Sequence, residues 1–242
     1  MSERIAAAPT LEARFAGAAY LYIVVAGIFV ELFVRSSLIV PSDAAATAAN
    51  ILGAEQLYRV GFVAELFLLV CDVLVAALLY RVLRPAGEMI ALLAAAFRLV
   101  MAAMLAANAL NHFEPVLLLG GEAVGVSLPT AQLEALALQA LRLQAVGYSA
   151  GLVFFGFACL FAGVGIIRSA FLPRPIGWLM TLAGVCYLVN SLSGFLAPDF
   201  ARALFPYILL PCLIAELSLS LWLLIAGING ARWLEQANRG VG

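Results

Sequence analysis

Five ionisable side chains interrupt long apolar segments of the sequence: Glu31, Glu65, Asp72, Arg98 and Glu216. A charge at the centre of a bilayer costs about 2.5–3.5 kcal/mol on insertion scales, so each of these groups needs a polar partner or serves a function. Buried carboxylates can bind a polar ligand or exchange protons as general acid and base. These five side chains are therefore the first candidates for a functional site.

The usual catalytic motifs do not accompany these charges. The sequence contains no GxSxG, HExxH, P-loop or GxGxxG pattern. Its one histidine, His112, excludes ligation of a haem by two histidines of one chain and is expected to form a hydrogen bond at the membrane interface. The four cysteines fall singly in four apolar segments, without the spacing of a zinc site or a disulfide framework. The sequence thus predicts no catalytic residue, no metal and no cofactor.

Asp72 and Arg98 are expected to form an ion pair. Asp72 lies nine residues before Arg81, about 13 Å from that end of its segment, and Arg98 lies ten residues after Glu88, about 15 Å along the next segment. Because these depths match and the connecting loop is short, the two side chains can meet. A pair that joins two helices is the structural interpretation, and a catalytic role is the functional one.

Glu65, Asn190 and Glu216 have a second common depth, about 24 Å from the same membrane face. We expect Glu65 and Glu216 to approach each other near Asn190. Three further charges lie beyond them, namely Glu31, Arg59 and Arg142. Two interpretations stay open: a polar cavity that opens outward, or separate hydrogen-bonded positions in the core.

The composition indicates that the segments containing these charges lie in a lipid bilayer. Of 242 residues, 65% are hydrophobic and 11% are charged, whereas soluble domains average about 45–50% apolar and 25% charged residues. A net charge of −1 provides no basic surface for nucleic acid. Membrane lipids are the expected partners, and the sequence does not indicate an oligomeric state.

Six apolar segments are long enough to cross a membrane as helices. They cover roughly residues 15–35, 60–80, 89–110, 146–167, 176–196 and 205–228. The first is expected to be a span and not a cleaved signal peptide. The fold class predicted is all-α: a polytopic bundle of six transmembrane helices in a single integral membrane domain, 1–242, with a short outer helical cap.

The arginines predict the orientation of these spans, because cytoplasmic loops carry an excess of positive charge. The face shared with the termini has eight arginines: Arg4, Arg14, Arg81, Arg84, Arg168, Arg174, Arg232 and Arg239. The opposite ends of the spans have three: Arg35, Arg59 and Arg202. Both termini are therefore expected in the cytoplasm, in a cell (inner) membrane. The complete absence of lysine favours a bacterial source.

Two features lie outside the apolar core of the spans. Pro41-Ser42-Asp43 precedes an Ala-rich stretch and predicts a capped short helix, with Asp43 and Asn50 on one face. From Thr130 the helical pattern continues into the fourth span, and a continuous helix over 130–167 would be about 57 Å long. That length exceeds the hydrocarbon core of about 30 Å, so the helix projects outward or bends.

The sequence resembles the 4386 family of domains of unknown function, which are bacterial multi-pass membrane proteins. The resemblance covers about residues 14–228 and is carried by short motifs along the chain: Arg14-x-x-Gly17-x-x-Tyr20, Pro41-Ser-Asp43-Ala-Ala-Ala-Thr47-Ala-Ala-Asn50, Arg59, Asp72, Ala-Phe97-Arg98, Gly151-Leu-Val-Phe154-Phe155-Gly156, Arg168-Ser169-x-x-Leu172-Pro173 and Glu216-Leu-x-Leu-x-Leu-Trp222-Leu-Leu. Gln144 replaces a histidine of the family pattern, and Ala226 replaces a lysine. The resemblance implies a membrane fold and brings no agreed reaction or ligand.

The functional hypothesis is a membrane protein that binds a small molecule or lipid in a polar cavity in the outer half of the bundle, as a transporter or a sensor does. The alternative is an intramembrane enzyme that acts on a lipid-like substrate with carboxylates as general acid and base. The candidate ligand-binding residues are Asp43, Asn50, Arg59, Glu65, Asp72, Arg98, Arg142, Asn190 and Glu216.

Overall fold

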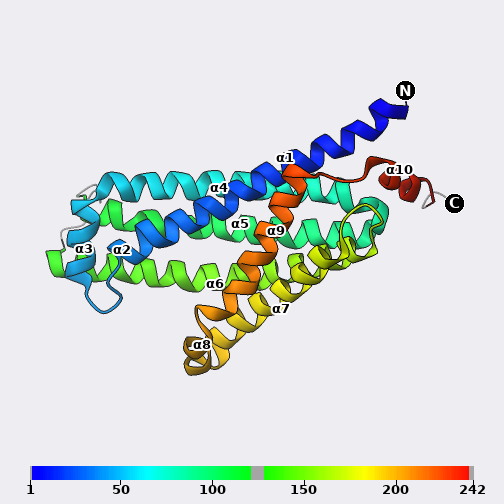
Figure 1. Cartoon of the computed structure of the whole chain (residues 1–242). Helices are drawn as coiled ribbons and strands as arrows, with labels where there is room; N and C mark the ends of the chain where they lie inside the picture. The colour runs from blue at the N-terminus through cyan, green and yellow to red at the C-terminus, as the bar shows by residue number, and fades with distance from the viewer. Residues whose placement is uncertain (1, 121–127, 240–242) are drawn as a thin grey trace. The chain divides into compact units, whose positions relative to one another are not determined.

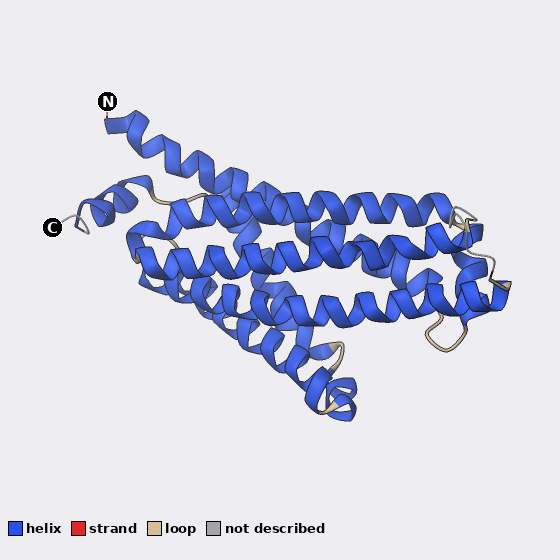
Figure 2. Ribbon diagram, turned by 180° about the vertical axis from the view of Figure 1, so that it is seen from behind, coloured by secondary structure: helices blue, strands red, loops and turns tan. Residues whose placement is uncertain are grey.

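The computed structural model describes the backbone of residues 2–120 and 128–239. It describes side chains from residue 9 onward within those ranges. Figure 1 and Figure 2 show that these residues form helices joined by short connections, and no strand occurs among them. The expectation of an all-α fold is confirmed.

Six helical segments of the described chain are long and apolar enough to cross a membrane. They are Pro9–Leu38, Glu55–Ala86, Glu88–Leu119, Thr130–Arg168, Arg174–Leu196 and Tyr207–Ile225. The first runs through α1 (Ser2–Phe29), the π-helix η1 (Val30–Arg35) and α2 (Ser36–Leu38), and the others contain α4 (Glu55–Leu83), α5 (Glu88–Leu119), α6 (Thr130–Arg168), α7 (Arg174–Leu196) and α9 (Leu210–Ile225). The long continuous helix expected from Thr130 is therefore present. Three shorter helices are α3 (Ala44–Gly53), α8 (Pro198–Leu204) and α10 (Gly230–Arg239).

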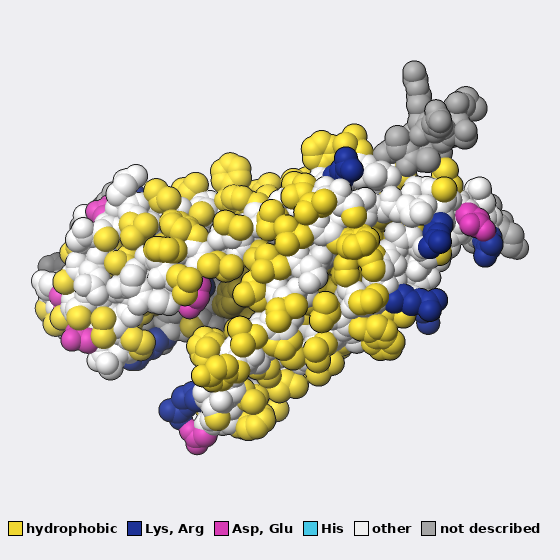
Figure 3. All heavy atoms as spheres, in the orientation of Figure 1, with side chains coloured by type: hydrophobic (Ala, Val, Ile, Leu, Met, Phe, Trp, Pro, Cys, Tyr) yellow, Lys and Arg dark blue, Asp and Glu magenta, His cyan; other side chains and the backbone are white. Residues whose placement is uncertain are grey.

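Large apolar side chains cover the outer surfaces of the spans. Figure 3 shows hydrophobic side chains over the visible face of α7 and α9. Leu182 and Leu196 of α7 are exposed, as are Ile214 and Ile225 of α9. Contiguous apolar surface of this extent would make a soluble protein aggregate, whereas in a bilayer lipid tails cover it. The chain is a multi-pass membrane protein.

The chain divides into two compact units, which we describe separately. The first unit contains the described residues up to Val24, Cys71–Ala102 and the residues from Ser149 onward. The second unit contains Val25–Val70 and the described part of Ala103–Tyr148. Helices α1, α4, α5 and α6 each contribute residues to both units. The expectation of a single domain stays a prediction.

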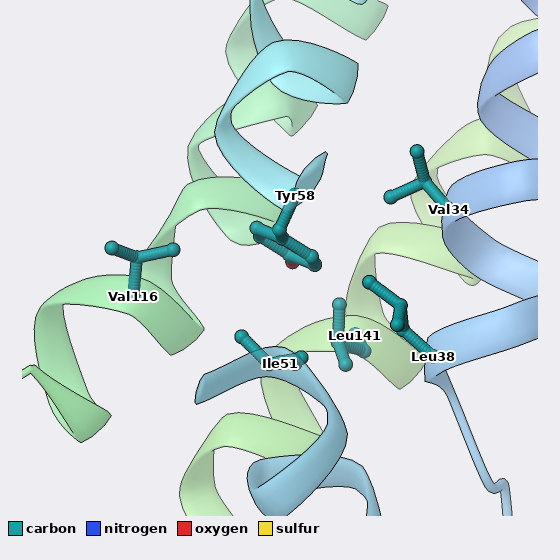
Figure 4. Close-up of a cluster of buried hydrophobic side chains, with 6 residues drawn as sticks. All are labelled: Val34, Leu38, Ile51, Tyr58, Val116 and Leu141. Carbon is teal, nitrogen blue, oxygen red and sulfur yellow. The ribbon is translucent and has the colours of Figure 1, made fainter. Parts of the chain in front are cut away.

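The second unit is held together at α3 by apolar packing and by an N-terminal cap. Figure 4 shows the cluster of buried side chains to which Ile51 of this helix belongs: Val34, Leu38, Ile51, Tyr58, Val116 and Leu141. The Asp43 side chain accepts a hydrogen bond from the backbone N–H of Ala46 at 2.9 Å, as expected of a capping residue. Asn50 Nδ2 donates to the carbonyl of Leu38 at 3.2 Å. The predicted capped helix is confirmed, and both polar candidates on it make local structural contacts.

In the first unit, α6 and α7 cross at glycines. A Cβ on Gly163 would lie 2.7 Å from the carbonyl oxygen of Gly177, and a Cβ on Gly184 would lie 2.7 Å from that of Gly156. Real Cβ atoms do not approach backbone oxygens so closely, so only glycine permits this packing distance. Small residues at helix crossings are a common means of packing in membranes, where burial in lipid provides no hydrophobic force between helices.

We predict that Gly184→Ala lowers the free energy of unfolding in detergent by about 1–3 kcal/mol, because the added methyl group overpacks the crossing. Gly194→Ala is the matched control on the same helix, since a Cβ there meets nothing within 4 Å. It should leave stability unchanged or raise it by up to about 1 kcal/mol through helix propensity. Equal unfolding midpoints for the two variants would contradict the close packing.

Candidate functional site

All six spans contribute to one polar region of the first unit. Five polar side chains from five spans form what we call the first-unit cluster: Tyr20 of α1, Asp72 of α4, Arg98 of α5, Tyr187 of α7 and Glu216 of α9. The remaining span, α6, adds the ring of Phe155, which packs against Arg98 and Tyr187. Four of the five polar side chains are buried, and Tyr187 is partly buried.

Asp72 and Arg98 form the expected ion pair. The Nε of Arg98 donates to Oδ1 of Asp72 at 2.9 Å, and Nη2 lies 2.6 Å from the same oxygen. The side chains are only 5% and 3% exposed. In such surroundings neither charge has water to solvate it, so each depends on the other.

Aromatic rings cover the guanidinium of Arg98. Its Cζ lies 4.4 Å from the ring centroid of Tyr20 and 5.1 Å from that of Phe155, within the range of cation–π attraction. Two polar atoms here lack a hydrogen bond of good geometry within the described part of the chain, namely Arg98 Nη2 and the Tyr20 hydroxyl. Neither atom is isolated, however, because Nη2 lies 2.6 Å from Oδ1 of Asp72 and the Tyr20 hydroxyl interacts with Arg98 and Glu216.

Glu216 adds a second carboxylate to this cluster. The Tyr187 hydroxyl donates to Oε1 of Glu216, and the charges of Arg98 and Asp72 also act on it. The first-unit cluster thus contains two carboxyl groups and one guanidinium, an excess of one acidic group. A cavity of about 10 Å³ lies next to Arg98, lined also by Cys159, Met180, Leu79 and five alanines. It offers room for about one water molecule.

A separate polar cluster lies in the second unit. We call Arg35, Tyr58, Glu65 and His112 the second-unit cluster. Oε1 of Glu65 accepts from Arg35 Nη2 at 2.9 Å, and Oε2 contacts Nδ1 of His112. The Tyr58 hydroxyl donates to the backbone carbonyl of His112. His112 is therefore a buried partner of Glu65, and its position at the membrane interface stays a prediction.

Glu65 and Glu216 have different partners from those that their common depth indicated. Glu65 binds Arg35 and His112, and Glu216 binds Tyr187. Helix rise gives the depth of a residue but not the direction in which its side chain points, so depth alone could not select among these groups. Asn190 is partly buried, and its carbonyl accepts a hydrogen bond from Ser193 Oγ at 3.1 Å.

The two remaining candidate arginines make structural contacts within the second unit. Arg59 Nε donates at 2.7 Å to the carboxylate one turn earlier in α4. Arg142 Nη2 donates to the carbonyl of Pro41 at 2.8 Å and so ties α6 to the segment before α3. Both side chains are at least partly exposed.

A comparison with protein families identifies the family of this chain. The family described as Domain of unknown function (DUF4386) matches residues 15–227. The chain belongs to this family. No curated protein and no solved structure matches it. The segment matched to DUF4386 contains every residue of both polar clusters.

Sequence reasoning did not place five of the cluster residues of this DUF4386 member in a site: Tyr20, Arg35, Tyr58, His112 and Tyr187. Tyr20 entered only as part of a family motif, and Arg35 only as a charge at the end of a span. A tyrosine in an apolar segment fits a lipid-facing or interfacial position as well as a core one, so Tyr187 carried no distinguishing signal. The buried acids Glu65 and Glu216 did signal that polar partners must exist.

We predict that Asp72→Asn lowers the free energy of unfolding of this DUF4386 protein by about 3–5 kcal/mol, because it leaves the Arg98 charge buried and unpaired. The double variant Asp72→Asn with Arg98→Gln should recover part of that loss, as measured by thermal unfolding in detergent. Asp199→Asn is a control that removes one partner of an exposed ion pair with Arg202. It should cost less than about 1 kcal/mol. A double variant as unstable as the sum of its single changes would exclude coupling between Asp72 and Arg98.

Proposed function

We propose that this protein binds a small molecule or lipid through the first-unit cluster, as a transporter or a sensor of the cell (inner) membrane does. One observation supports the proposal above others: five spans bring charged and polar side chains to one cluster inside the first unit, and Arg98 of that cluster lines a cavity. Apolar side chains of similar volume would stabilise the core as well as a buried guanidinium with two carboxyl groups does, so the cluster calls for a function. A ligand with hydrogen-bonding groups can interact with these side chains.

The charges of the cluster favour a neutral ligand. Arg98 Nη2 and the Tyr20 hydroxyl offer donors, whereas Asp72 and Glu216 would repel an anion. A molecule with carbonyl, ester or hydroxyl oxygens can accept from the donors without adding negative charge. The ester region of a lipid and a free neutral solute share this chemistry.

The cavity beside Arg98 requires a conformational change before such a ligand enters. Its volume of about 10 Å³ is far below the roughly 300–1,000 Å³ of ordinary ligand pockets. Binding would then select an opened arrangement of the first unit. This coupling of occupancy to conformation is the property that a transporter or a sensor needs. The site is assigned to Glu216, Asp72 and Arg98 in place of the outer cavity with Glu65 and Asn190 that the sequence indicated.

The intramembrane enzyme is the second candidate, because Glu216 is a carboxyl group that accepts a hydrogen bond from a tyrosine hydroxyl, in the same cluster as the cavity-lining Arg98. Catalysis would also require a reacting bond placed beside that carboxyl group. Binding requires only the hydrogen-bond donors of the first-unit cluster and the opening of the cavity beside Arg98. The two functions differ in one observable: an enzyme converts the molecule that it retains.

Binding is predicted to depend on the Tyr20 hydroxyl. We expect native mass spectrometry of the protein, incubated with a bacterial polar lipid extract and with a mixture of neutral polyols and amides, to detect at least one retained component. Tyr20→Phe should weaken its retention by about tenfold or more, since one hydrogen bond contributes on the order of 1.4 kcal/mol. Its thermal midpoint should fall less than that of Tyr187→Phe, because the Tyr20 hydroxyl interacts with Arg98 and Glu216 without a hydrogen bond of good geometry.

Tyr187→Phe provides the comparison, since it removes a hydroxyl that does donate to Glu216. This variant should lose thermal stability. The proposal is wrong if the wild type retains nothing from either mixture, or if Tyr20→Phe retains every component equally well. Recovery of a chemically altered component would instead favour the enzyme. Retention of a component from the lipid extract or from the mixture of polyols and amides shows which source supplies the ligand.

Both termini are proposed to lie in the cytoplasm of a bacterial cell, supported by eight arginines on their face against three on the other. We predict that green fluorescent protein fused after residue 242 fluoresces, and that alkaline phosphatase fused at the same position is inactive. The phosphatase inserted between α8 and α9, after Phe205, should be active. The reverse pattern would place the termini outside.

A further inference from the structure

Arginines outnumber carboxylates at one end of the first unit, where α4 ends, α6 leads into α7, and α10 lies. Each carboxylate described there pairs with an arginine: Glu12 with Arg81, Glu88 with Arg84, and Glu235 with Arg239. Four more arginines have no carboxylate partner among the described residues: Arg14, Arg168, Arg174 and Arg232. Seven arginines less three carboxylates leave an excess of four positive charges, which attracts anions to this end.

Three of the unmatched arginines surround the connection between α6 and α7. Arg168 is the last residue of α6, and Arg174 is the first residue of α7. Helix α10 is bound to the same connection, because Arg232 Nη1 donates to the carbonyl of Ala170 at 3.4 Å and Gln236 Nε2 donates to the carbonyl of Arg168 at 3.2 Å. We call Arg168, Arg174 and Arg232 the arginine patch. All three side chains are exposed, and Figure 3 shows arginine side chains gathered next to α10 on the visible face.

An exposed apolar strip of α7 continues from the arginine patch. Trp178 lies one turn after Arg174 and is 63% exposed. Leu182, Val185 and Val189 follow at helical spacing and are exposed as well. Tryptophan favours the level of the lipid headgroups, and the residues beyond it suit the hydrocarbon region. Along this face of α7 the order is therefore a cation, an interfacial ring and an apolar strip.

We propose that the arginine patch binds the phosphate of an anionic phospholipid whose acyl chains lie along the exposed face of α7. Guanidinium groups donate charge-assisted hydrogen bonds to phosphate oxygens. The start of α7 at Arg174 adds the positive end of a helix dipole beside the same group. The apolar strip beyond Trp178 favours a lipid over a free phosphate, since a free anion leaves that strip unused.

The absence of a carboxylate partner selects among lipid headgroups. A zwitterionic headgroup carries an ammonium group beside its phosphate, and the arginines would repel that cation. An anionic headgroup such as phosphatidylglycerol carries only the negative charge. This site is separate from the first-unit cluster, where Asp72 and Glu216 would repel an anion, and it holds whether or not that cluster binds a ligand.

A bound phosphate has a structural consequence for α10. If it contacts Arg232 together with Arg168 or Arg174, it joins α10 to the α6–α7 connection through a second set of contacts. A ligand that binds only the folded state raises its stability in proportion to the logarithm of ligand concentration. Thermal unfolding therefore provides a readout besides retention of the lipid.

Native mass spectrometry of the delipidated full-length chain in detergent tests the site. Phosphatidylglycerol should bind at least about tenfold more tightly than phosphatidylcholine with the same acyl chains, and it should raise the thermal midpoint. Its binding should weaken as salt is added, because salt screens exposed charges. Glycerol 3-phosphate, which has the phosphate but no acyl chains, should not displace the lipid at equal concentration.

Two double variants with the same change in net charge locate the site. Arg168→Gln with Arg174→Gln should weaken phosphatidylglycerol binding by about tenfold or more, since each arginine near an anionic surface contributes about fivefold in affinity. Arg59→Gln with Arg202→Gln is the matched control, because these arginines lie at the opposite ends of the spans and each pairs with a carboxylate. It should leave the affinity within about twofold of the wild type. Far-UV circular dichroism should show that both variants are folded.

Three results would overturn the proposal. Equal affinities for phosphatidylglycerol and phosphatidylcholine would show that the patch does not recognise charge. Equal losses in the two double variants would show a general effect of net charge and not a site. Displacement of the lipid by glycerol 3-phosphate at equal concentration would show that a free anion is the ligand and that the exposed face of α7 takes no part.

Discussion

The charge of Arg98 constrains the first unit more than any other single group. A guanidinium cannot lose its proton within the membrane, so its surroundings must solvate it. Asp72 supplies the opposite charge, and the rings of Tyr20 and Phe155 supply polarisable surface. These contacts come from α1, α4 and α6, so matching one buried charge fixes the relative positions of four helices in this unit. Of these helices, α6 also packs closely against α7 at glycines.

Both clusters pair a carboxylate of α4 with an arginine, but the additional polar groups beside that pair differ. Each joins a carboxylate of α4 to an arginine of another helix, Asp72 to Arg98 and Glu65 to Arg35. Each arginine also lies over a tyrosine ring. In the first-unit cluster the additional groups are a second carboxyl and a tyrosine hydroxyl, whereas the second-unit cluster contains an imidazole. Their polar groups differ accordingly: a carboxyl group with a tyrosine hydroxyl in the first, and an imidazole beside a carboxylate in the second.

Exposure separates these clusters from the other ion pairs of the described residues. The pairs of Arg59 with Glu55 and Arg84 with Glu88 have side chains at least 37% exposed, where screening leaves little net stabilisation. Asp72 and Arg98 are nearly inaccessible. Buried pairs are poor net contributors to stability compared with apolar packing, so their presence calls for a role in specificity or function.

The amino-acid sequence by itself determined the class of fold. Its apolar segments are long enough to cross a bilayer only as helices, because a bilayer offers no partners for unpaired backbone groups. The cap at Asp43 and the continuous helix from Thr130 followed from local patterns for the same reason: each depends on residues within a few turns. The Asp72–Arg98 pair was also predictable, since a short loop and equal depths left few other arrangements.

The partners of Glu65 and Glu216 were decided by the tertiary structure alone. Sequence spacing gives the height of a side chain along its helix, but the face that it presents depends on how each helix is rotated against its neighbours. That rotation is set by many packing contacts from distant parts of the chain, such as the fit of α6 against α7 at Gly163 and Gly177. Glu65 therefore meets Arg35 and His112, and Glu216 meets Tyr187, although all three partners were visible in the sequence.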